Sequence, residues 1–165
     1  MDEVAAGRIE TLATLYERYK GPILGFLLNR SSGNRATAED LLQTTFERVI
    51  KYRGSWKSDQ TFKAWLFTIA RNAHYDHHRK AGRFPLNDDY ELNQLPVTED
   101  EQLPDCKAAL SALPENYRIV LELAWQRNLK YAEIAQVLGT TEANVKVRMH
   151  RACKRLRSNH QKTTR

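Results

Sequence analysis

Apolar residues recur at intervals of three and four through residues 9–83, which predicts three amphipathic helices. Pro22 lies inside the first pattern and should kink or split that helix. Thr37 is predicted to cap the second helix, with Asp40 three residues later as in a capping box. Residues 54–61 are polar apart from Trp56 and predict a loop before the third helix. The predicted buried positions are Leu12, Leu15, Tyr16, Tyr19, Ile23, Phe26 and Leu27, then Leu41, Leu42, Thr45, Phe46, Val49 and Ile50, then Phe62, Trp65, Leu66, Ile69 and Ala73.

A second helical pattern covers residues 105–157. Pro114 ends a short first helix, and residues 115–127 predict a second helix that Asn128 closes in the left-handed conformation. Its inward positions are predicted to be Val120, Leu121, Ala124 and Trp125. A helix, a turn at residues 139–141 and a last helix follow. The predicted centre of this core is Trp125, Ile134, Val137, Leu138, Val145 and Met149.

The last helix has one apolar stripe and a basic outer face. Val145, Met149, Ala152 and Leu156 share the stripe, because their spacings are four, three and four. Two helices joined by a short turn, the second basic on its free face, fit the DNA major groove. The alternative is an ordinary amphipathic hairpin with a solvated face. The outer arc holds Ala143, Val147, His150, Arg151 and Lys154, flanked by Lys146, Arg148, Arg155 and Arg157.

Charge separates these two parts of the chain. The 165 residues have a net charge of +6, but residues 85–105 contain seven acidic residues and no Lys or Arg. This segment also contains Pro85, Pro96 and Pro104, which predicts a linker between two helical modules. The basic balance elsewhere indicates a polyanionic partner.

The composition narrows the class of protein. No 18-residue apolar run predicts a transmembrane helix, and the N-terminal residues MDEVAAGRIETL do not resemble a secretion signal. Cys106 and Cys153 lack CxxC spacing, which indicates reduced thiols in a cytosol, with a redox disulfide as the lesser alternative. No Ser/His/Asp set, phosphate loop or paired carboxylates indicate an enzyme.

The third predicted helix combines basic and aromatic residues, a pattern suited to single-stranded nucleic acid. The rings are Trp56, Phe62, Trp65, Phe67 and Tyr75, and the cations Arg71, Arg79, Lys80 and Arg83. Helical spacing makes Phe62 and Trp65 better candidates for the core than for base stacking.

A histidine cluster lies in the same helix. His74 and His78 stand four residues apart beside Asp76 and His77 and could share a metal. No further ligand set is evident, so the polar end of a basic helix is the preferred interpretation, without metal or other cofactor.

Several motifs together resemble one family. Residues 38–46 (AEDLLQTTF), Trp56 and residues 62–72 (FKAWLFTIARN) resemble region 2 of the extracytoplasmic-function, or ECF, sigma factors. Residues 110–114 (LSALP), 131–135 (YAEIA) and 145–152 (VKVRMHRA) resemble their region 4. The resemblance implies an all-α fold of two small helical domains, region 2 over residues 1–84 and region 4 over 105–165, joined by an acidic flexible linker over 85–104.

The resemblance also implies a function and its residues. Such a protein is a cytoplasmic, non-catalytic subunit that binds the β′ clamp and β flap of core RNA polymerase and directs it to promoters. It is commonly held inactive by an anti-sigma factor, often membrane-bound. The implied core-binding residues are Asp40, Gln43 and Phe46. Those for the melted −10 strand are Trp56, Lys63, Arg71, Asn72, Arg79 and Lys80. Those for the −35 duplex are Lys146, Val147, His150 and Arg151, with Arg148, Lys154 and Arg155 on phosphates.

This chain departs from the family pattern at several positions. Thr44 stands where an acid is frequent, and Lys130 replaces a Ser that would cap the next helix, a loss of about 1 kcal/mol. Val147 replaces a frequent Ser on the reading face and offers an apolar contact instead of a hydrogen bond. The alternatives are a sigma-like decoy that binds only an anti-sigma factor and a stand-alone helix-turn-helix regulator.

Overall fold

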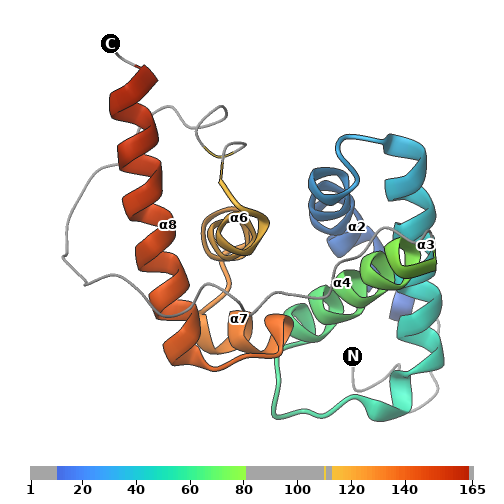
Figure 1. The fold of residues 1–165 in the computed structure, drawn as a ribbon. Coiled ribbons are helices and arrows are strands. Elements are labelled where there is room, and N and C mark those ends of the chain that lie inside the picture. Colours follow the sequence, from blue (N-terminus) through green and yellow to red (C-terminus); the bar gives the residue numbers. More distant parts are fainter. Residues whose placement is uncertain (1–10, 81–109, 111–112, 164–165) are drawn as a thin grey trace. The chain divides into compact units, whose positions relative to one another are not determined.

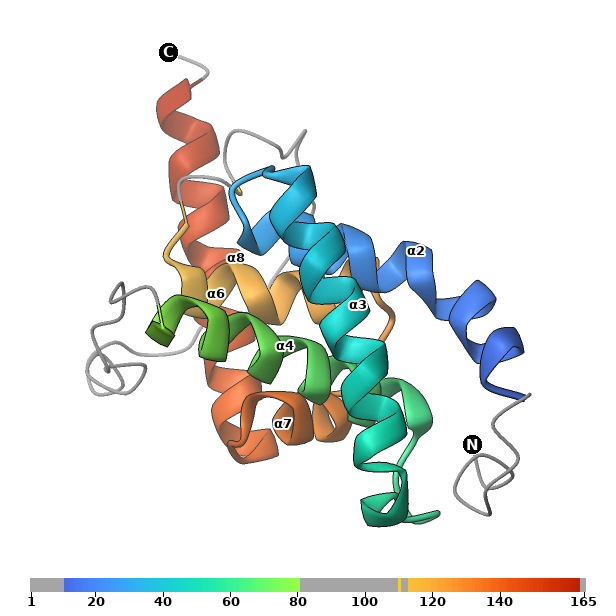
Figure 2. The ribbon, with the colours of Figure 1, turned by 90° about the vertical axis from the view of Figure 1, so that its right-hand side faces the viewer.

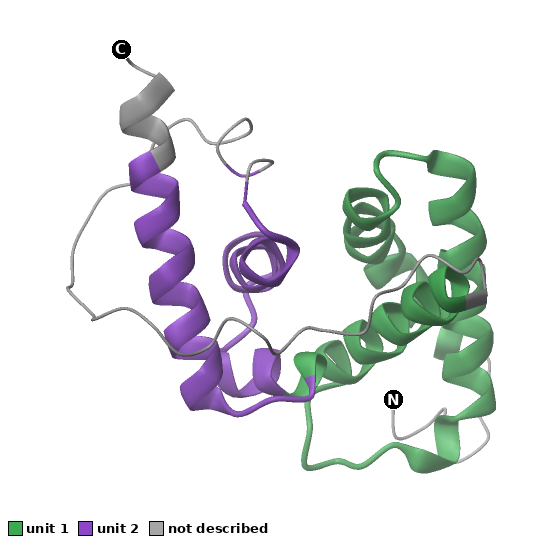
Figure 3. Ribbon diagram, viewed as in Figure 1, with its two compact units in different colours: residues 1–84, 136–138 green, residues 85–135, 139–165 purple. Residues whose placement is uncertain are grey.

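The computed structural model describes residues 11–80, 110 and 113–163 (Figure 1). Within these ranges the chain forms helices and turns, and no strand occurs. Contacts divide it into two compact units, residues 1–84 with 136–138, and residues 85–135 with 139–165 (Figure 3). The all-α fold class is therefore confirmed. The predicted acidic linker, residues 85–104, lies outside the described residues.

The first unit is built from three long helices that pack on one another (Figures 1 and 2). They are α2 (Leu12–Arg30), α3 (Arg35–Lys51) and α4 (Phe62–Lys80), and a short 3-10 helix, η2 (Arg53–Ser55), follows α3. Phe26 and Phe67 meet edge to face in the core, with ring centroids 5.2 Å apart. The residues without solvent exposure are Ile23, Phe26, Leu27, Ala38, Thr45, Val49, Ala64, Leu66, Phe67 and Ala70.

Two features of the helices in this unit differ from prediction. The α2 helix is not split at Pro22, because the proline removes only one backbone hydrogen bond while Ile23, Phe26 and Leu27 after it are buried; a kink there stays a prediction. The α3 helix begins at Arg35, and its N-cap is Asn34 instead of Thr37. The Thr37 backbone N–H donates to Asn34 Oδ1 at 3.0 Å. An asparagine cap competes well with a threonine cap, so the helix starts earlier.

Four consecutive helical segments follow along the chain, and all of their residues except 136–138 belong to the second unit. They are α6 (Glu115–Leu121), the π-helix η3 (Glu122–Gln126), α7 (Tyr131–Leu138) and α8 (Glu142–Thr163), of which α6 packs against α8 (Figure 1). The stripe predicted on the last helix is confirmed, since all four of its residues are buried. The buried set includes Leu113, Tyr117, Val120, Leu121, Leu123, Leu129, Ile134, Val145, Met149, Ala152 and Leu156. The short helix predicted before Pro114 falls mostly outside the described residues.

The π-helix η3 overturns the predicted position of Trp125. A π-helical turn contains more residues than an α-helical turn, so it rotates the following side chains relative to an α-helical pattern. Leu123 is fully buried, whereas Trp125 is 43% exposed and Ala124 is half-buried. The 3.6-residue period used to place Trp125 in the core therefore fails within this segment. Asn128 has φ 50°, as predicted for the residue that closes the helix.

The turn between α7 and α8 has well-defined end contacts. Gly139 has φ 64°, a left-handed conformation that glycine adopts without strain. The Thr141 hydroxyl accepts from the Asn144 backbone N–H at 3.2 Å, as an N-cap does for α8. At the start of α7, Glu133 accepts from the Lys130 backbone N–H at 2.7 Å. This bond supplies half of a capping box although Lys130 has no hydroxyl.

Candidate functional site

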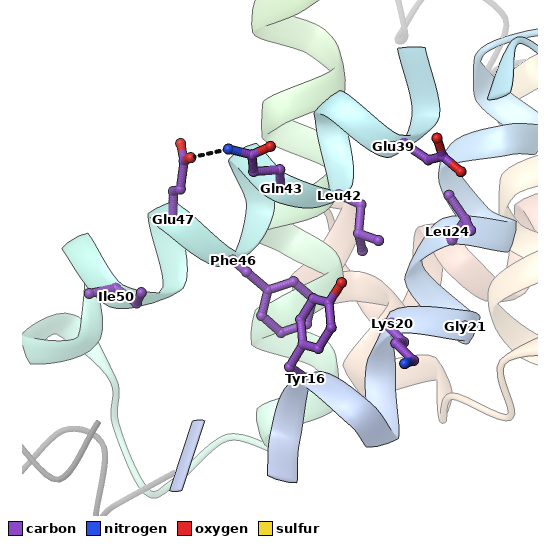
Figure 4. Close-up of a pocket in the computed structure, with 10 residues that line it drawn as sticks. All are labelled: Tyr16, Lys20, Gly21, Leu24, Glu39, Leu42, Gln43, Phe46, Glu47 and Ile50. Atoms are coloured by element: carbon purple, nitrogen blue, oxygen red, sulfur yellow. Dashed lines mark hydrogen bonds between the residues drawn. The ribbon is translucent and has the colours of Figure 1, made fainter. Parts of the chain in front are cut away.

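An apolar groove of about 620 Å³ runs between α2 and α3 (Figure 4). Tyr16 and Phe46 meet at its floor, edge to face, with ring centroids 4.9 Å apart. Gln43 donates to Glu47 at 2.9 Å along the rim. The lining residues are Tyr16, Lys20, Gly21, Leu24, Glu39, Leu42, Gln43, Phe46, Glu47 and Ile50.

The groove includes two of the three residues predicted to dock on the polymerase. Gln43 and Phe46 line it, and Asp40 lies on the exposed surface of α3 without lining it. The rim is charged on both sides. Glu39 pairs with Arg35 at 2.8 Å, and Lys20 pairs with Glu17 at 2.8 Å, a hydrogen-bonded contact that raises the pKa of Lys20. An apolar floor with a charged rim suits a protein partner better than a small molecule.

The residues predicted to stack on bases belong mainly to the protein interior. Phe67 is fully buried, so the prediction that its ring stacks on bases is wrong. Trp65 is 9% exposed, which confirms the preferred prediction that it belongs to the core. Trp56 is half-buried, with its ring centroid 5.6 Å from Trp65 and 6.0 Å from Phe62. The loop ring is therefore anchored on the start of α4, with part of its surface still accessible.

A second pocket, of about 360 Å³, opens between α3 and α4. Asn72 lines it and is exposed, and no hydrogen bond joins its side chain to any residue that the structure describes. A free amide beside aromatic rings can hydrogen-bond the edge of an unpaired base. The lining residues are Arg48, Tyr52, Ile69, Asn72, Tyr75 and Asp76.

Three of these lining residues, Arg48, Tyr52 and Asp76, escaped the sequence analysis as site residues. Arg48 Nη1 donates to Asp76 Oδ2 at 2.8 Å across the two helices. The partners are 28 residues apart, so no sequence spacing indicates that they meet. The sequence offers one signal for this contact. Arg48 is a cation on α3, and the helix pattern assigns a place to each of its neighbours but no partner to Arg48 itself.

The other residues predicted for the −10 strand are spread along α4. Lys63 is half-buried at its start. The Arg71 guanidinium lies over the Tyr75 ring, 4.5 Å from its centroid, and Arg79 pairs with Asp76 at 3.1 Å. The side chain of Lys80 lies outside the described residues. These contacts leave a line of cations on the helix that carries Asn72.

The histidine cluster on α4 has a structural contact. His74 is 8% exposed, and its Nε2 lies 3.2 Å from the Arg30 carbonyl oxygen at the end of α2. Its ring centroid is 4.3 Å from that of His78. Among the described residues, no group of three or more His, Cys, Asp or Glu side chains could hold a metal ion.

The outer face of α8 presents most of the predicted −35 residues. Lys146 and Lys154 are exposed, and Val147, His150 and Arg151 are half-buried. Lys146 also pairs with Glu142 at 3.0 Å, one turn earlier in the helix. Arg148 is only 7% exposed, which is incompatible with the predicted exposed flank. Two of the predicted flanking residues therefore differ, since Lys146 is exposed and Arg148 is buried, and three of the outer-arc residues are only half-buried.

Two further side chains of α8 contact the body of their unit. The Arg155 guanidinium lies over the Tyr117 ring of α6, 5.0 Å from its centroid, while the side chain remains exposed. Cys153 is a free thiol whose pKa is raised by burial. Cys106 lies outside the described residues, so the alternative of a disulfide stays a prediction. No helix within residues 11–80 and 113–163 is long and apolar enough to cross a membrane.

Comparisons with known proteins assign both units. A family model for Sigma-70 region 2 matches residues 15–84, and one for Sigma-70 region 4 matches residues 107–156. The chain is 34% identical to the ECF RNA polymerase sigma factor SigM of Bacillus subtilis, over 90% of this chain and 94% of SigM. It is 36% identical to the ECF sigma factor SigE of Mycolicibacterium smegmatis, over 79% of this chain and 54% of SigE.

Solved structures agree with this assignment. The chain is similar to the sigma factor RpoE of Bartonella quintana, solved with the anti-sigma factor NepR, with a TM-score of 0.67, 27% identity and coverage of 89% of this chain and 94% of RpoE. It also shares the fold of CnrH, solved with the cytosolic domain of CnrY, with a TM-score of 0.69, 23% identity and coverage of 97% and 94%. This chain therefore belongs to the ECF family of RNA polymerase sigma factors.

Proposed function

We propose that this chain binds core RNA polymerase, directs it to promoters with specific −10 and −35 elements, and assists promoter melting. The observation that carries the proposal is the presence of regions 2 and 4 in this order in one chain. A stand-alone helix-turn-helix regulator would leave the first unit without a role. The family acts in initiation without catalysis, so no reaction is assigned to this chain, and its place of action is the bacterial cytoplasm.

In this proposal the α2–α3 groove is the docking surface for the β′ clamp. Its apolar floor and charged rim suit a helical protein segment that buries apolar residues and satisfies polar ones at the edge. Gln43 and Phe46 supply the groove contacts, and Asp40 extends the surface along α3. The β flap is the proposed partner of the second unit.

The α3–α4 pocket is the proposed site for an unpaired base of the −10 element. Asn72 supplies an unpartnered amide at its edge, and Tyr52 and Tyr75 supply ring surface. A base that leaves the duplex stack loses its stacking and pairing energy. Binding this extruded base in the pocket offsets that cost and stabilises the open strand without hydrolysis. The strand would then run along Trp56, Lys63, Arg71, Arg79 and Lys80.

The outer face of α8 is the proposed reader of the −35 duplex. Lys146, Val147, His150 and Arg151 face the bases, and Lys154 and Arg155 contact phosphates, which position a protein without specifying sequence. Arg148 is left out of this set because of its burial. Val147 provides an apolar surface that fits the methyl group of thymine.

We further propose control by an anti-sigma factor. RpoE, which is 27% identical to this chain, was solved bound to one. The apolar α2–α3 groove offers such an inhibitor a surface that the polymerase also needs. Attachment of that inhibitor to the membrane would hold the complex at the inner membrane.

In vitro transcription with sigma-free core polymerase on genomic DNA fragments, followed by start-site mapping, tests the proposal. The wild-type chain should produce discrete starts with shared upstream elements. Lys146→Ala with Arg151→Ala should abolish −35-dependent initiation while core binding persists, whereas Asp40→Arg should weaken core binding. Arg18→Ala, at an exposed position of α2, is the matched control for loss of a positive charge.

The same experiment separates the alternatives. A decoy would bind an anti-sigma factor but support no initiation with core polymerase. A stand-alone regulator would bind promoter DNA without core polymerase and would not confer initiation on sigma-free enzyme. The absence of any start above the core-only background would refute the proposed function.

A further inference from the structure

Asp76 holds two arginines at the α3–α4 pocket. Its Oδ2 accepts from Arg48 Nη1 at 2.8 Å, and its Oδ1 accepts from Arg79 Nη2 at 3.1 Å. The exposed fraction of the side chain rises outward across the network, from 25% for Arg48 to 34% for Asp76 and 78% for Arg79. One carboxylate therefore connects a cation that lines the pocket to a cation on the exposed surface of α4.

Arg48 and Arg79 both keep N–H donors that can bind a ligand in addition to Asp76. A guanidinium has five N–H donors in a rigid plane, and each of these two uses one on Asp76. Arg48 lines the pocket together with Asn72, so its other donors are available to a group that enters there. Arg79 projects from the α4 surface, where a phosphate of the same strand would pass.

We propose that Asp76 is a positioning residue for −10 strand binding, and that Arg48 is a further residue that binds the captured base. Arg48 donates to the acceptor edge of the base beside Asn72, and Arg79 contacts a neighbouring phosphate. Asp76 lines the pocket but hydrogen-bonds neither the base nor the phosphate; its role is to fix both guanidiniums. This inference rests on the proposed function, which places the melted strand at this pocket.

Asp76 is negatively charged although its proposed site binds a negatively charged strand, and its benefit is to order the neighbouring arginine side chains. A free arginine side chain loses rotamer entropy when it is ordered on a ligand. Asp76 orders both arginines before the strand arrives, which removes part of that cost. Its negative charge opposes the strand by Coulomb repulsion, but two paired cations outnumber it within the network.

These two effects of Asp76 predict opposite signs for one substitution. If Asp76 acted only through its charge, Asp76→Asn would tighten strand binding, because a negative group next to DNA would be removed. If Asp76 acts by positioning, Asp76→Asn weakens binding although the protein becomes more positive. The amide keeps the size of the side chain and one acceptor oxygen, so it perturbs the packing of α3 on α4 very little.

The test uses the full chain in complex with core polymerase and a fluorescently labelled single strand carrying the −10 element from a mapped start site. Fluorescence anisotropy gives the affinity over a range of salt concentrations. Asp76→Asn and Arg48→Met should each weaken binding about tenfold, the loss expected for a charge-assisted hydrogen bond. The double variant should be little weaker than Asp76→Asn alone, because Asp76→Asn already releases Arg48 from its bound orientation.

Salt dependence provides an independent readout. For single strands, the slope of log affinity against log salt changes by about 0.7 for each phosphate contact. Asp76→Asn and Arg79→Gln should both give a shallower slope, since each loses the phosphate contact of Arg79. Glu115→Gln removes an equal charge and one exposed ion pair, with Arg118, from α6, and it should leave affinity and slope unchanged.

Several outcomes would overturn the inference. Equal or tighter binding by Asp76→Asn, additive losses in the double variant, or an unchanged slope for Arg79→Gln would each do so. Measurements of thermal unfolding and of core binding confirm that each variant is folded. If Asp76→Asn does not fold, Arg79→Gln still tests the Arg79 part of the inference. A wild-type complex that does not bind the strand would instead refute the proposed function, so the two failures are distinguishable.

Discussion

Replacing Leu123 with lysine should unfold the second unit, whereas the same change at Trp125 should be tolerated. Leu123 is 0% exposed, so the change loses about 1.5–3 kcal/mol of side-chain burial. Placing an ammonium group in the interior costs several kcal/mol more. The total is comparable with the whole stability of a small domain, about 5–15 kcal/mol.

At Trp125 the same lysine has water within reach. The ring is 43% exposed, so the lysine stem can cover part of the same surface while its charge stays solvated. The expected loss is about 1–2 kcal/mol, within the ordinary range for a point substitution. The contrast between two positions only two residues apart arises from the π-helical turn of η3.

Urea unfolding of the full chain, followed by far-UV circular dichroism, measures both effects. Hydrogen exchange over residues 115–157 locates them in the second unit. With a urea slope of about 1–3 kcal/mol/M, Trp125→Lys should lower the midpoint by roughly 0.5–1 M. Gln126→Lys, at an exposed neighbour, is the matched control. A larger loss at Trp125 than at Leu123 would show that the segment is a regular α-helix with the tryptophan inside, and would refute the reasoning.

Three further predictions follow from local contacts. Asn34→Ala should cost about 1 kcal/mol in urea unfolding because it removes the α3 cap, whereas Thr37→Ala, which contributes only its backbone N–H there, should cost much less. Burial raises the pKa of Cys153 above its ordinary value of 9.0, so the folded thiol stays protonated at a pH where the unfolded thiol ionises. This contribution to stability is complete below pH 9.0 and is lost as the pH rises through the folded pKa. Urea unfolding of the wild type and of Cys153→Ser, each at pH 8 and at pH 10, would detect the loss. Arg155→Ala should lower both thermal stability and duplex affinity because the guanidinium also stacks on Tyr117, whereas Lys146→Ala should lower duplex affinity alone; equal thermal shifts would contradict this.

Helical periodicity was sufficient where the backbone is regular. The stripe of Val145, Met149, Ala152 and Leu156 is buried as predicted, because α8 keeps 3.6 residues per turn throughout. The same reasoning placed Trp125 in the core and was wrong there, because no residue type marks a π-helical turn. The inward position belongs instead to Leu123, two residues earlier, and the tryptophan ring is exposed.

The site residues were predictable only where they lie within one helix or one motif. Asn72 follows from the motif in α4, and the structure places it at a pocket. Arg48 and Asp76 belong to different helices, and their contact depends on how α3 packs on α4. Phe67 was assigned to base stacking because aromatic residues beside cations suit nucleic acid, but its place on α4 turns it fully into the core.

The α3 helix carries both candidate surfaces of the first unit. Gln43, Phe46 and Glu47 contribute to the α2–α3 groove, while Arg48 contributes to the α3–α4 pocket on a neighbouring face of the same 17-residue helix. Successive residues of a helix point about 100° apart, so a partner seated on Glu47 does not have to cover Arg48. If the groove is the docking surface for the polymerase clamp, as proposed, an inhibitor that filled it would exclude the clamp and leave the pocket open. Inhibition by such a protein would act on recruitment of the polymerase, with the strand-binding residues already in position when the groove is released.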